Sequence, residues 1–324
     1  MIKAVGLLSG GLDSTVAAKL LIDIGINVYA INFISPFCTC TPKNASCSSI
    51  ITAVKQLGNI PLKRVILGDE YLEIVKKPKY GYGKGMNPCI DCRVIKIKKA
   101  AQYMREIGAH FLFTGEVVGQ RPMSQHRRAI EIIDKESQMA GLILRPLSAQ
   151  ILPPTIPEQK GLVDRKQLLA ISGRSRKIQM LIASQKNIND YPCPHGGCLL
   201  TDLHFAKRLK DYFMHTQNPS INDIPLLKIG RHFRHENGDK IIVARNEKEG
   251  KLLLKLRTDS EIIFNPINFS APVVLLQGIN KNFALQKIIE YTKKEIPKNA
   301  IIQVIDKFSD EKFLFYKLMR SHNI

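Results

Sequence analysis

Ala4-Val5-Gly6-Leu7-Leu8 is a short apolar run that leads directly into Ser9-Gly10-Gly11-Leu12-Asp13-Ser14, after which an apolar helix-like stretch begins. The pattern predicts a buried strand, a tight glycine turn and the N-terminus of a helix. A glycine pair at such a junction lets backbone N–H groups turn toward an anion and lets the anion approach closely. The stretch therefore predicts an anion site at the end of the first strand.

The polar residues of this turn indicate what the anion is. Serine hydroxyls add donors, and the Asp13 carboxylate can bind Mg²⁺ or orient a nucleotide. The turn is neither a Walker A motif nor a Gly-x-Gly-x-x-Gly motif. It resembles the pyrophosphate loop (SGGxDS) of the ATP pyrophosphatase superfamily, whose members cleave ATP between the α and β phosphates. An ordinary Ser/Gly turn is the alternative; the resemblance implies ATP binding and adenylyl transfer at Ser9, Gly10, Gly11, Asp13 and Ser14.

Length and composition limit the class of protein. The 324 residues suffice for about two domains, and a hydrophobic content of 44% supports a sizeable core. No apolar run approaches the length of a membrane span, and Met1-Ile2-Lys3 enters a strand without a signal-peptide pattern. We therefore expect a cytoplasmic protein that does not contact a membrane.

The net charge of +20 is high for an enzyme that acts on small molecules. Residues 225–324 carry 18 Lys+Arg against 11 Asp+Glu, and residues 1–224 carry 30 against 17. Because both parts are basic, both could contact one large polyanion, and nucleic acid is the favoured partner. General basicity of a lysine-rich proteome is the alternative.

The first 150 residues alternate apolar β-like runs with helical stretches. Strands are predicted at 4–8, 28–33, 64–67, 110–114 and 142–147, and helices at 14–24, 46–57, 94–107 and 123–136. This alternation favours an α/β fold with a doubly wound parallel sheet, whose ligands bind at the C-terminal strand ends. The loop of residues 9–14 and Thr114-Gly115-Glu116 both follow strands, so we expect them to converge.

The pattern changes in the second half of the chain. Residues 151–160 form a Pro-rich connector that is not expected to be a regular helix, and helices are predicted at 165–171, 175–184 and 203–214. After Asn218-Pro219, short strands (240–245, 261–264 and 273–277) alternate with brief helices. We predict a domain boundary near residue 220, which gives a domain of residues 1–220 and a smaller α+β domain of residues 221–324.

Seven cysteines lie at positions 38, 40, 47, 89, 92, 193 and 198. The odd number argues against a disulfide scaffold. Cys89 and Cys92 form a Cys-x-x-Cys at a predicted helix start followed by lysines, and both features favour thiolates. Cys198 lies in a Gly-rich turn where its thiol would be accessible.

These thiols allow several chemistries. Thiolates of Cys89, Cys92 and Cys198 could bind three irons of a [4Fe–4S] cluster and leave the fourth iron open for sulfide. A persulfide carried by a pair of thiols, a redox pair and half of a zinc site are the alternatives. Cys193 is the weaker substitute for Cys198, and buried or incidental roles are favoured for Cys38, Cys40 and Cys47 over a second metal or redox set.

Together these motifs resemble the PP-loop tRNA thiouridine synthases, which have a HUP (adenine nucleotide alpha hydrolase-like) fold. Residues 114–120 with Ser124-Gln125, and Arg145-Pro146-Leu147, are similar to the 4-thiouridine synthetases of the ThiI type. Asn87-Pro88-Cys89-x-x-Cys92 and the distal Cys198 resemble the 2-thiouridine synthases of the MnmA type. The resemblance covers residues 1–220 and implies ATP, Mg²⁺ and tRNA as ligands.

The resemblance also implies a reaction. A uridine carbonyl oxygen attacks the α-phosphate of ATP, and sulfur on the cluster of Cys89, Cys92 and Cys198 then displaces AMP. The nucleoside of ATP would lie near Ala30, Phe33 and residues 114–116. The flipped uridine of tRNA would enter a basic face formed by Arg93, Lys96, Lys99, Arg121, Arg127 and Arg128.

Other groups have less defined parts in this scheme. His126 and His195 could move protons, although loop histidines are more often bystanders. No THUMP-like or rhodanese-like domain is recognised in the sequence, so we expect sulfur from free sulfide or a separate carrier protein. The sequence does not distinguish whether position 2 or position 4 of the uridine ring receives the sulfur.

The C-terminal segment is similar to the NFACT-R module of RNA-binding proteins, through residues 228–234 and 240–247. This similarity implies that Arg231, Arg234 and Arg245 contact phosphates and that Phe233 stacks on a base. A structural β-unit with ordinary surface charge is the alternative.

Three other functions are alternatives: a PP-loop amidotransferase or ligase, a small-molecule thiolase, and a non-catalytic RNA-binding protein. No glutaminase domain or N-terminal Cys nucleophile supports the first. The intact loop and the three cysteines argue against the last.

Overall fold

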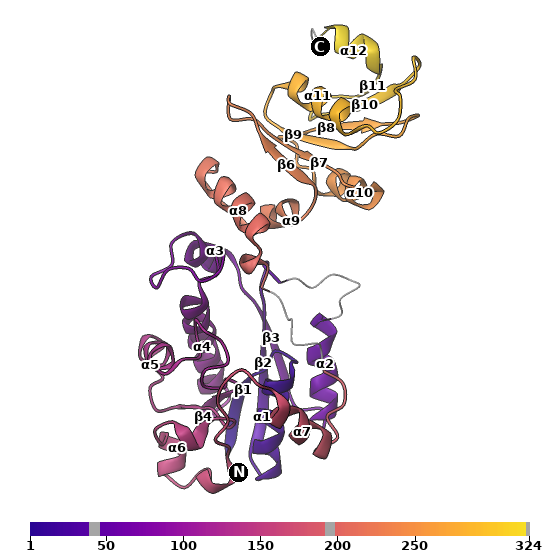
Figure 1. Cartoon of the computed structure of the whole chain (residues 1–324). Helices are drawn as coiled ribbons and strands as arrows, with labels where there is room; N and C mark the ends of the chain where they lie inside the picture. The colour runs from indigo at the N-terminus through magenta and orange to yellow at the C-terminus, as the bar shows by residue number, and fades with distance from the viewer. Residues whose placement is uncertain (39–45, 192–197, 322–324) are drawn as a thin grey trace. The chain divides into compact units, whose positions relative to one another are not determined.

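A computed structural model describes residues 1–38, 46–191 and 198–321 of the chain (Figure 1). The chain divides into two compact units, Met1–Ala206 and Lys207–Ile324. This division falls inside helix α8 (Leu203–His215), earlier than the boundary predicted near residue 220. A helix that runs on through the boundary leaves no break in composition for the sequence to reveal.

The first unit contains a parallel five-stranded sheet in the order β3-β2-β1-β4-β5. This confirms the predicted α/β fold with a doubly wound sheet. Chain order reverses between β1 and β4, and ligands of such sheets bind at that reversal. The strands are β1 (Lys3–Leu7), β2 (Asn27–Ile34), β3 (Leu62–Ile66), β4 (Phe111–Thr114) and β5 (Ile143–Leu144).

Helices cover both faces of this sheet because alternate strand residues point to opposite sides. Ala4 packs with residues of α1 (Leu12–Asp23), α2 (Ser46–Gln56) and α7 (Lys177–Gln185) in one buried cluster. Its neighbour Val5 packs with α4 (Cys89–Glu106) and α5 (Arg127–Glu136) in the other. Both clusters are continuous apolar cores.

Three local expectations differ from the structure. Helix α3 (Asp69–Lys76) was not anticipated, and the helix expected at 165–171 is a single 3-10 turn, η2 (Arg165–Gln167). The connector of residues 151–160 contains a four-residue helix, α6 (Ile156–Gln159), contrary to prediction. Its proline lies in the first turn, where no backbone N–H is needed, and Thr155 with Glu158 forms a capping box.

The first unit closes with short elements around the core. These are the 3-10 turns η1 (Ala149–Ile151) and η3 (Leu199–Thr201). They follow β5 and precede α8, respectively.

The second unit is an antiparallel six-stranded sheet in the order β11-β10-β8-β9-β7-β6, as expected for an α+β domain. Helix α11 (Lys281–Tyr291) packs on one face through the cluster of Ile241 and Leu276, and α10 (Glu247–Leu256) packs on the other through the cluster of Ile242 and Leu275. The remaining elements are η4 (Ile221–Asp223), α9 (Ile224–Leu227), β6 (Arg231–Arg234), β7 (Lys240–Val243), β8 (Ile262–Pro266), β9 (Val274–Gln277), β10 (Ile301–Ile305), β11 (Asp310–Leu314) and α12 (Phe315–Ser321).

Among the described residues, no helix combines the length and apolar character needed to cross a bilayer.

Candidate active site

The glycine loop between β1 and α1 has a conformation that depends on its glycines. Gly10 has a φ of +77°, and a Cβ there would lie 2.5 Å from the backbone N of Ile50 in α2. The N-cap of α1 is Gly11, which provides no side-chain cap for the first N–H groups of the helix. The loop thus leaves helix N–H groups free for an anion.

Hydrogen bonds between two serines brace this loop. The Ser9 and Ser14 hydroxyls lie 3.2 Å apart, and the Ser14 hydroxyl donates to the Gly11 carbonyl at 2.9 Å. The Ser9 hydroxyl also accepts from the Gly11 N–H at 3.3 Å. Both predicted hydroxyl donors therefore take part in the shape of the loop itself.

Asp13 is held from two sides, yet one of its oxygens is unused. Its Oδ2 accepts from Gln120 Nε2 at 2.8 Å and lies 3.4 Å from the Arg176 guanidinium. Two oxygens, Oδ1 of Asp13 and Oε1 of Gln120, are buried and have no hydrogen-bond partner in the described structure. Unsatisfied buried oxygens at the mouth of a glycine loop are typical of a site that completes its bonds with a ligand or an ion.

Arg176 is a functional candidate that the sequence analysis missed. It lies immediately before α7, whose residues pack against α1. The run Arg174-Ser175-Arg176-Lys177 after the apolar Ile171 was a usable signal, because it concentrates charge at a predicted helix start.

The segment after β4 meets the loop, as expected for two strand ends at the reversal of chain order. A Cβ on Gly115 would lie 2.5 Å from the Ser14 Cα and backbone N, so only glycine fits there. Thr114 is buried and donates to Glu116 at 3.2 Å. Residues 114–116 thus abut the loop through backbone and not through exposed side chains.

Glu116 is fully buried and bound to two arginines. Its Oε2 accepts from Arg145 Nε at 3.0 Å, and its Oε1 lies 3.3 Å from Arg93 Nε. Burial alone would raise the pKa of Glu116, but the charges of Arg93 and Arg145 outweigh it and lower that pKa. Arg145 also pairs with Asp134 of α5 at 2.7 Å. The Glu116 side chain therefore links Arg93 of α4 and Arg145, which follows β5, to the end of β4, while its buried Oε1 has no hydrogen-bond partner in the described structure.

The other two residues predicted to hold the nucleoside do not lie together. Ala30 is fully buried in the core on the α1 side of the sheet, whereas Phe33 packs against the core on the α4 side. The two residues are three positions apart along β2, so their side chains point to opposite faces of the sheet. Between them, Asn32 donates to the Leu8 carbonyl at 2.8 Å and fixes the end of β1.

The three predicted thiols converge. Cys89 and Cys92 lie in the first turn of α4, and the Met86 N–H donates to the Leu200 carbonyl at 2.9 Å, which brings the Cys198 segment alongside. The Cys198 Sγ lies 4.0 Å from Asn87 Oδ1, and all three cysteines are free. Residues that are more than 100 positions apart in sequence are thus neighbours in space.

The surroundings of the thiols differ. Burial would raise the pKa of Cys92, but Lys96, a hydrogen bond from the buried Tyr71 and the charge of Arg93 together lower it. Burial raises the pKa of Cys198 to about 11, and a backbone hydrogen bond at Leu200 only partly opposes this rise. Cys92 is therefore the thiol most favoured as thiolate. Tyr71 belongs to α3, the helix that the sequence did not reveal.

Among the described residues, no group of three or more Cys, His, Asp or Glu side chains is placed so that it could hold a metal ion. Three free thiols are nevertheless the donor type of an iron–sulfur cluster, in which each thiolate binds a different iron.

The remaining cysteines and histidines contribute less. Cys38 is disulfide-bonded, contrary to the expectation of a buried or incidental thiol, and its backbone forms a β-bridge with that of the free Cys198. Cys40, Cys193, His195 and the side chain of Cys47 lie outside the described residues. His126 accepts from the Ala129 N–H at 3.2 Å as the N-cap of α5, which occupies its Nδ1 in a structural bond.

The predicted basic face of the first unit is partly neutralised. Arg93 pairs with Glu116, Lys99 pairs with Glu70 at 2.8 Å, and Arg127 donates to a backbone carbonyl. Arg121 and Arg128 are exposed. Lys96 lies beside Cys92.

In the second unit, two of the arginines predicted to contact RNA are likewise engaged in ion pairs. Arg234 donates two hydrogen bonds to Asp211, at 2.9 and 2.7 Å, and Arg245 is bound to Glu249. Phe233 packs against the core of the unit beside Tyr291. Of the four residues predicted to touch RNA, Arg231 and Arg245 are exposed, and of these two Arg245 is engaged in an ion pair.

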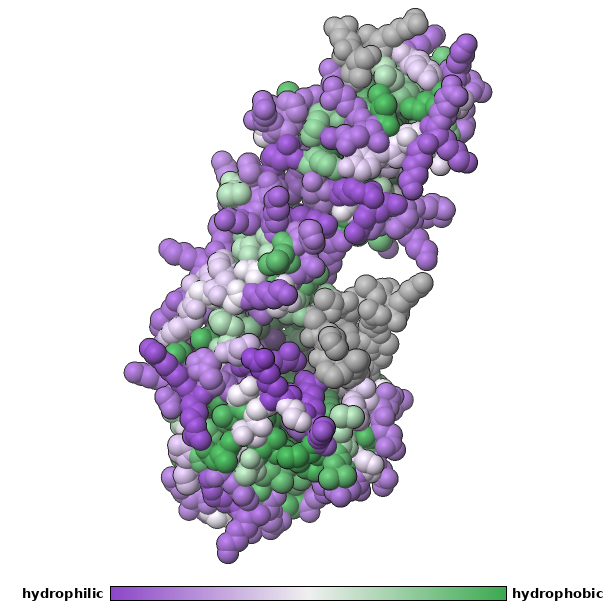
Figure 2. Space-filling model, in the orientation of Figure 1, coloured by the Kyte–Doolittle hydropathy of each residue, from purple (hydrophilic) through white to green (hydrophobic). Residues whose placement is uncertain are grey.

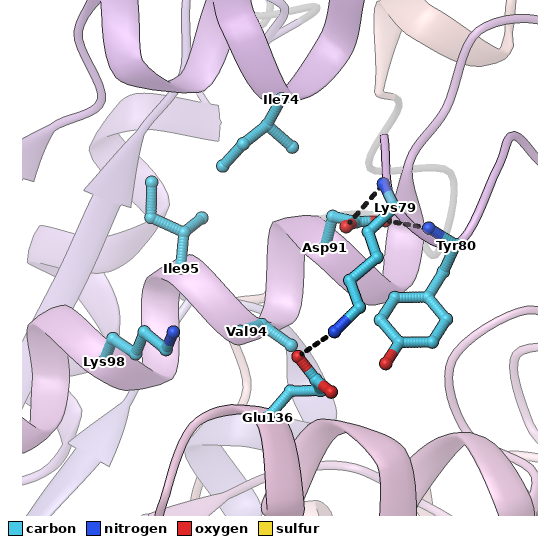
Figure 3. A pocket seen from close by; sticks show the side chains of 8 residues that line it. All are labelled: Ile74, Lys79, Tyr80, Asp91, Val94, Ile95, Lys98 and Glu136. Atoms are coloured by element: carbon cyan, nitrogen blue, oxygen red, sulfur yellow. Dashed lines mark hydrogen bonds and ion pairs between the residues drawn. The ribbon is translucent and has the colours of Figure 1, made fainter. Parts of the chain in front are cut away.

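A cavity of about 320 Å³ lies on another part of the first unit, against α4 (Figure 3). Its walls include the Lys79–Glu136 ion pair, and Asp91 accepts two backbone N–H groups at its rim. It shares no residue with the glycine loop or the three cysteines, and its walls contain no buried unpaired group.

Loop, strand order and thiols together define an α/β protein with a pyrophosphate-type loop at the sheet reversal and a cysteine centre linked to it through Arg93. Residues 2–150 match the family model described as thiamine biosynthesis protein (ThiI), and residues 230–321 match that of the NFACT protein RNA binding domain. The resemblance is therefore confirmed: the chain resembles the PP-loop tRNA thiouridine synthases of the ThiI and MnmA type, with a C-terminal module similar to NFACT-R.

Two curated relatives illustrate the similarity. A tRNA-specific 2-thiouridylase MnmA of Dichelobacter nodosus (strain VCS1703A) is 28% identical over 223 residues, which cover 64% of this chain and 54% of the relative. A probable tRNA sulfurtransferase of Thermoanaerobacter sp. (strain X514) is 33% identical over 148 residues, 45% of this chain and 36% of the relative. The chain thus spans about half the length, or less, of these relatives.

Two solved structures are also similar. A 4-thiouridine synthetase–RNA complex with bound ATP has a TM-score of 0.39 at 22% identity, covering 70% of this chain and 52% of that one. The U34-tRNA thiolase NcsA from Methanococcus maripaludis with its [4Fe-4S] cluster has a TM-score of 0.35 at 19% identity, covering 70% and 73%. At these TM-scores neither structure establishes a property of this chain.

Proposed function

We propose that this protein is an ATP-dependent tRNA sulfurtransferase that adenylates a uridine carbonyl oxygen and replaces it with sulfur. The observation that carries the proposal is the meeting of three free thiols beside an arginine that binds the end of β4, next to the glycine loop. The names of the relatives, a tRNA-specific 2-thiouridylase and a tRNA sulfurtransferase, support it.

ATP binds with its phosphates against the glycine loop. The free N–H groups of α1 and the positive end of the helix dipole attract the phosphates, and Gly10 and Gly11 allow their close approach. The unpaired Oδ1 of Asp13 fits Mg²⁺, since carboxylate oxygens are its preferred protein ligands. Arg176 neutralises charge that develops on the departing pyrophosphate.

The first chemical step is adenylyl transfer. The O2 or O4 atom of a uridine, flipped out of its stack, forms a bond to the α-phosphorus as the bond to pyrophosphate breaks. This converts a poor leaving group, oxide, into a good one, AMP. Sulfur then bonds to the ring carbon, the bond from that carbon to the AMP oxygen breaks, and thiouridine and AMP leave.

Cys89, Cys92 and Cys198 deliver the sulfur. If the three thiolates bind a [4Fe–4S] cluster, it supplies an open iron that can hold sulfide. In the alternative, one thiol carries the sulfane sulfur as a persulfide, and a second forms a disulfide with it as the sulfur leaves, which an external thiol reductant then reopens. In both cases Lys96 and Tyr71 hold Cys92 as thiolate.

Nucleoside mass spectrometry tests the proposal. The reconstituted protein is incubated anaerobically with tRNA, ATP, Mg²⁺ and sulfide, and the digested tRNA is searched for thiouridine. We expect a new thiouridine, with its fragmentation and retention distinguishing position 2 from position 4. Cys198→Ala should abolish the product and keep ATP affinity, whereas Asp13→Asn should weaken both.

Two outcomes would contradict the proposal. ATP conversion to AMP and pyrophosphate without a thionucleoside would favour a small-molecule thiolase or a ligase. Undiminished RNA binding with no ATP turnover, indifferent to Cys198→Ala, would favour a non-catalytic RNA-binding protein.

A further inference from the structure

A row of alternating cations and aromatic rings lies on the α11 side of the second unit. The Arg231 guanidinium lies 5.0 Å from the centre of the Tyr291 ring, and Lys287 Nζ lies 4.8 Å from that of Phe233. The two rings are 5.7 Å apart. Arg231 and Phe233 belong to β6, which is an edge strand, and the other two residues belong to α11.

Lysines continue this row beyond the end of α11. Lys293, Lys294 and Lys298 are exposed in the segment between α11 and β10. Within the described residues, no ion pair involves them or Arg231, while Lys287 is paired with Glu290. Hydrophilic residues cover most of the visible face of this unit (Figure 2).

The other arginines that the sequence suggested for RNA contact are engaged. Asp211 binds both Arg234 and Lys240, and Glu249 binds Arg245. These carboxylates neutralise the cations and fix them to the fold. On the α11 side of the sheet, the cations without an ion pair in the described structure therefore include Arg231, Lys293, Lys294 and Lys298.

We propose that Arg231, Tyr291, Lys293, Lys294 and Lys298 form the RNA-binding surface of the second unit, and that its ligand is an unpaired RNA strand. Cations spaced along an edge match the repeating phosphates, and a partly exposed ring beside them can stack on a base. An unpaired strand is favoured because the bases of a duplex already stack on each other. Under the proposed function this strand belongs to the tRNA substrate, and the inference rests on that function for the identity of the RNA alone.

The unit offers a matched control on the opposite face of its sheet. Lys248 and Lys255 are exposed on α10, with no ion pair in the described structure. A Lys248→Gln/Lys255→Gln variant removes the same charge as Lys293→Gln/Lys294→Gln. All four positions are exposed, so neither variant should disturb folding.

The test measures binding of the full chain to a fluorescently labelled oligouridine by anisotropy at several salt concentrations, without ATP or sulfide. Lys293→Gln/Lys294→Gln should weaken binding about tenfold at 0.1 M salt and reduce the slope of log K against log salt by about 1.4, or about 0.7 for each phosphate contact. The α10 control should leave the slope unchanged. Equal losses of oligouridine affinity in the two double variants would overturn the assignment of the RNA-binding surface.

A second pair of variants tests stacking. Tyr291→Leu should weaken oligouridine binding about 5-fold or more at an unchanged salt slope, whereas Tyr291→Phe should keep the affinity of the wild type. No loss with Tyr291→Leu, or an equal loss for a duplex RNA, would overturn the assignment of an unpaired strand. Because no thiolation is measured, failure of the proposed function would leave these results intact.

Discussion

The carboxylate of Glu116 allows a sharp test of whether residues 114–116 support the site or touch the nucleotide. We consider Glu116→Gln, which keeps the size of the side chain and removes its charge. Glu116 and Arg145 are almost fully buried, and Arg93 is about two-thirds buried. Breaking a buried ion pair by removing one partner costs about 3–5 kcal/mol, because the remaining charge stays buried and uncompensated.

We expect the lower end of that range, about 3 kcal/mol, since glutamine can still accept from Arg145. Glu70→Gln is the control: its ion pair with Lys99 is exposed, so the loss should stay below about 1 kcal/mol. The assay is a urea titration followed by pulsed hydrogen exchange of peptides from β1 and β4, which reports the unfolding of the first unit separately. ATP affinity is measured in parallel by calorimetry.

The pH dependence has a definite sign. The folded-state pKa of Glu116 lies below the ordinary glutamate value of 4.5, so the stabilisation is fully present above pH 4.5 and is lost as pH falls through the folded pKa. Glu116→Gln should remove this dependence. Wild-type stability combined with lost ATP affinity would refute the structural role and restore Glu116 as a nucleotide ligand.

Two further predictions concern the loop and the second unit. Gly115→Ala should reduce ATP affinity at least tenfold in calorimetry, because the added Cβ would lie 2.5 Å from the Ser14 backbone. Gly68→Ala is the control and should have no effect, because a Cβ at that position has no neighbour within 4 Å. Equal ATP affinities of the two variants would contradict the close approach of residue 115 to the loop. Burial, with Lys240 nearby, lowers the pKa of His232 from 6.5 to about 3. As the pH falls, the unfolded chain therefore takes up a proton that the folded chain does not, and the free energy of unfolding of the second unit should fall by about 2 kcal/mol between pH 7.5 and 5. His232→Gln should abolish that loss in urea titrations, and a persisting loss would assign it to other groups.

The sequence alone determined the local features of the first unit. Strand and helix periods, together with Ser9-Gly10-Gly11, predicted the parallel sheet and its loop, because the alternation of apolar strands with helices and the glycine turn are patterns along the chain. The Cys-x-x-Cys at the start of α4 was likewise readable, since a helix N-terminus and its first turn are adjacent in sequence.

Tertiary structure decided which charged groups are free. Arg234, Arg245 and Glu116 all looked available, but each one meets a partner of opposite charge. Asp211 lies 23 positions from Arg234, and Arg145 lies 29 from Glu116. No pattern along the chain records these two long-range pairings, whereas the pairing of Arg245 with Glu249, four positions on, is a local one.

The three thiols likewise separate what the sequence determined from what the tertiary structure decided. The sequence supplied three cysteines of suitable chemistry, and only folding brought Cys198 beside Asn87, 111 positions away. It also brought the buried Tyr71 to Cys92 and Arg176 to Asp13. Local pattern determines backbone elements, because hydrogen bonds within an element depend on near neighbours; a site depends on side chains from several elements, and their distances are fixed only when the core packs.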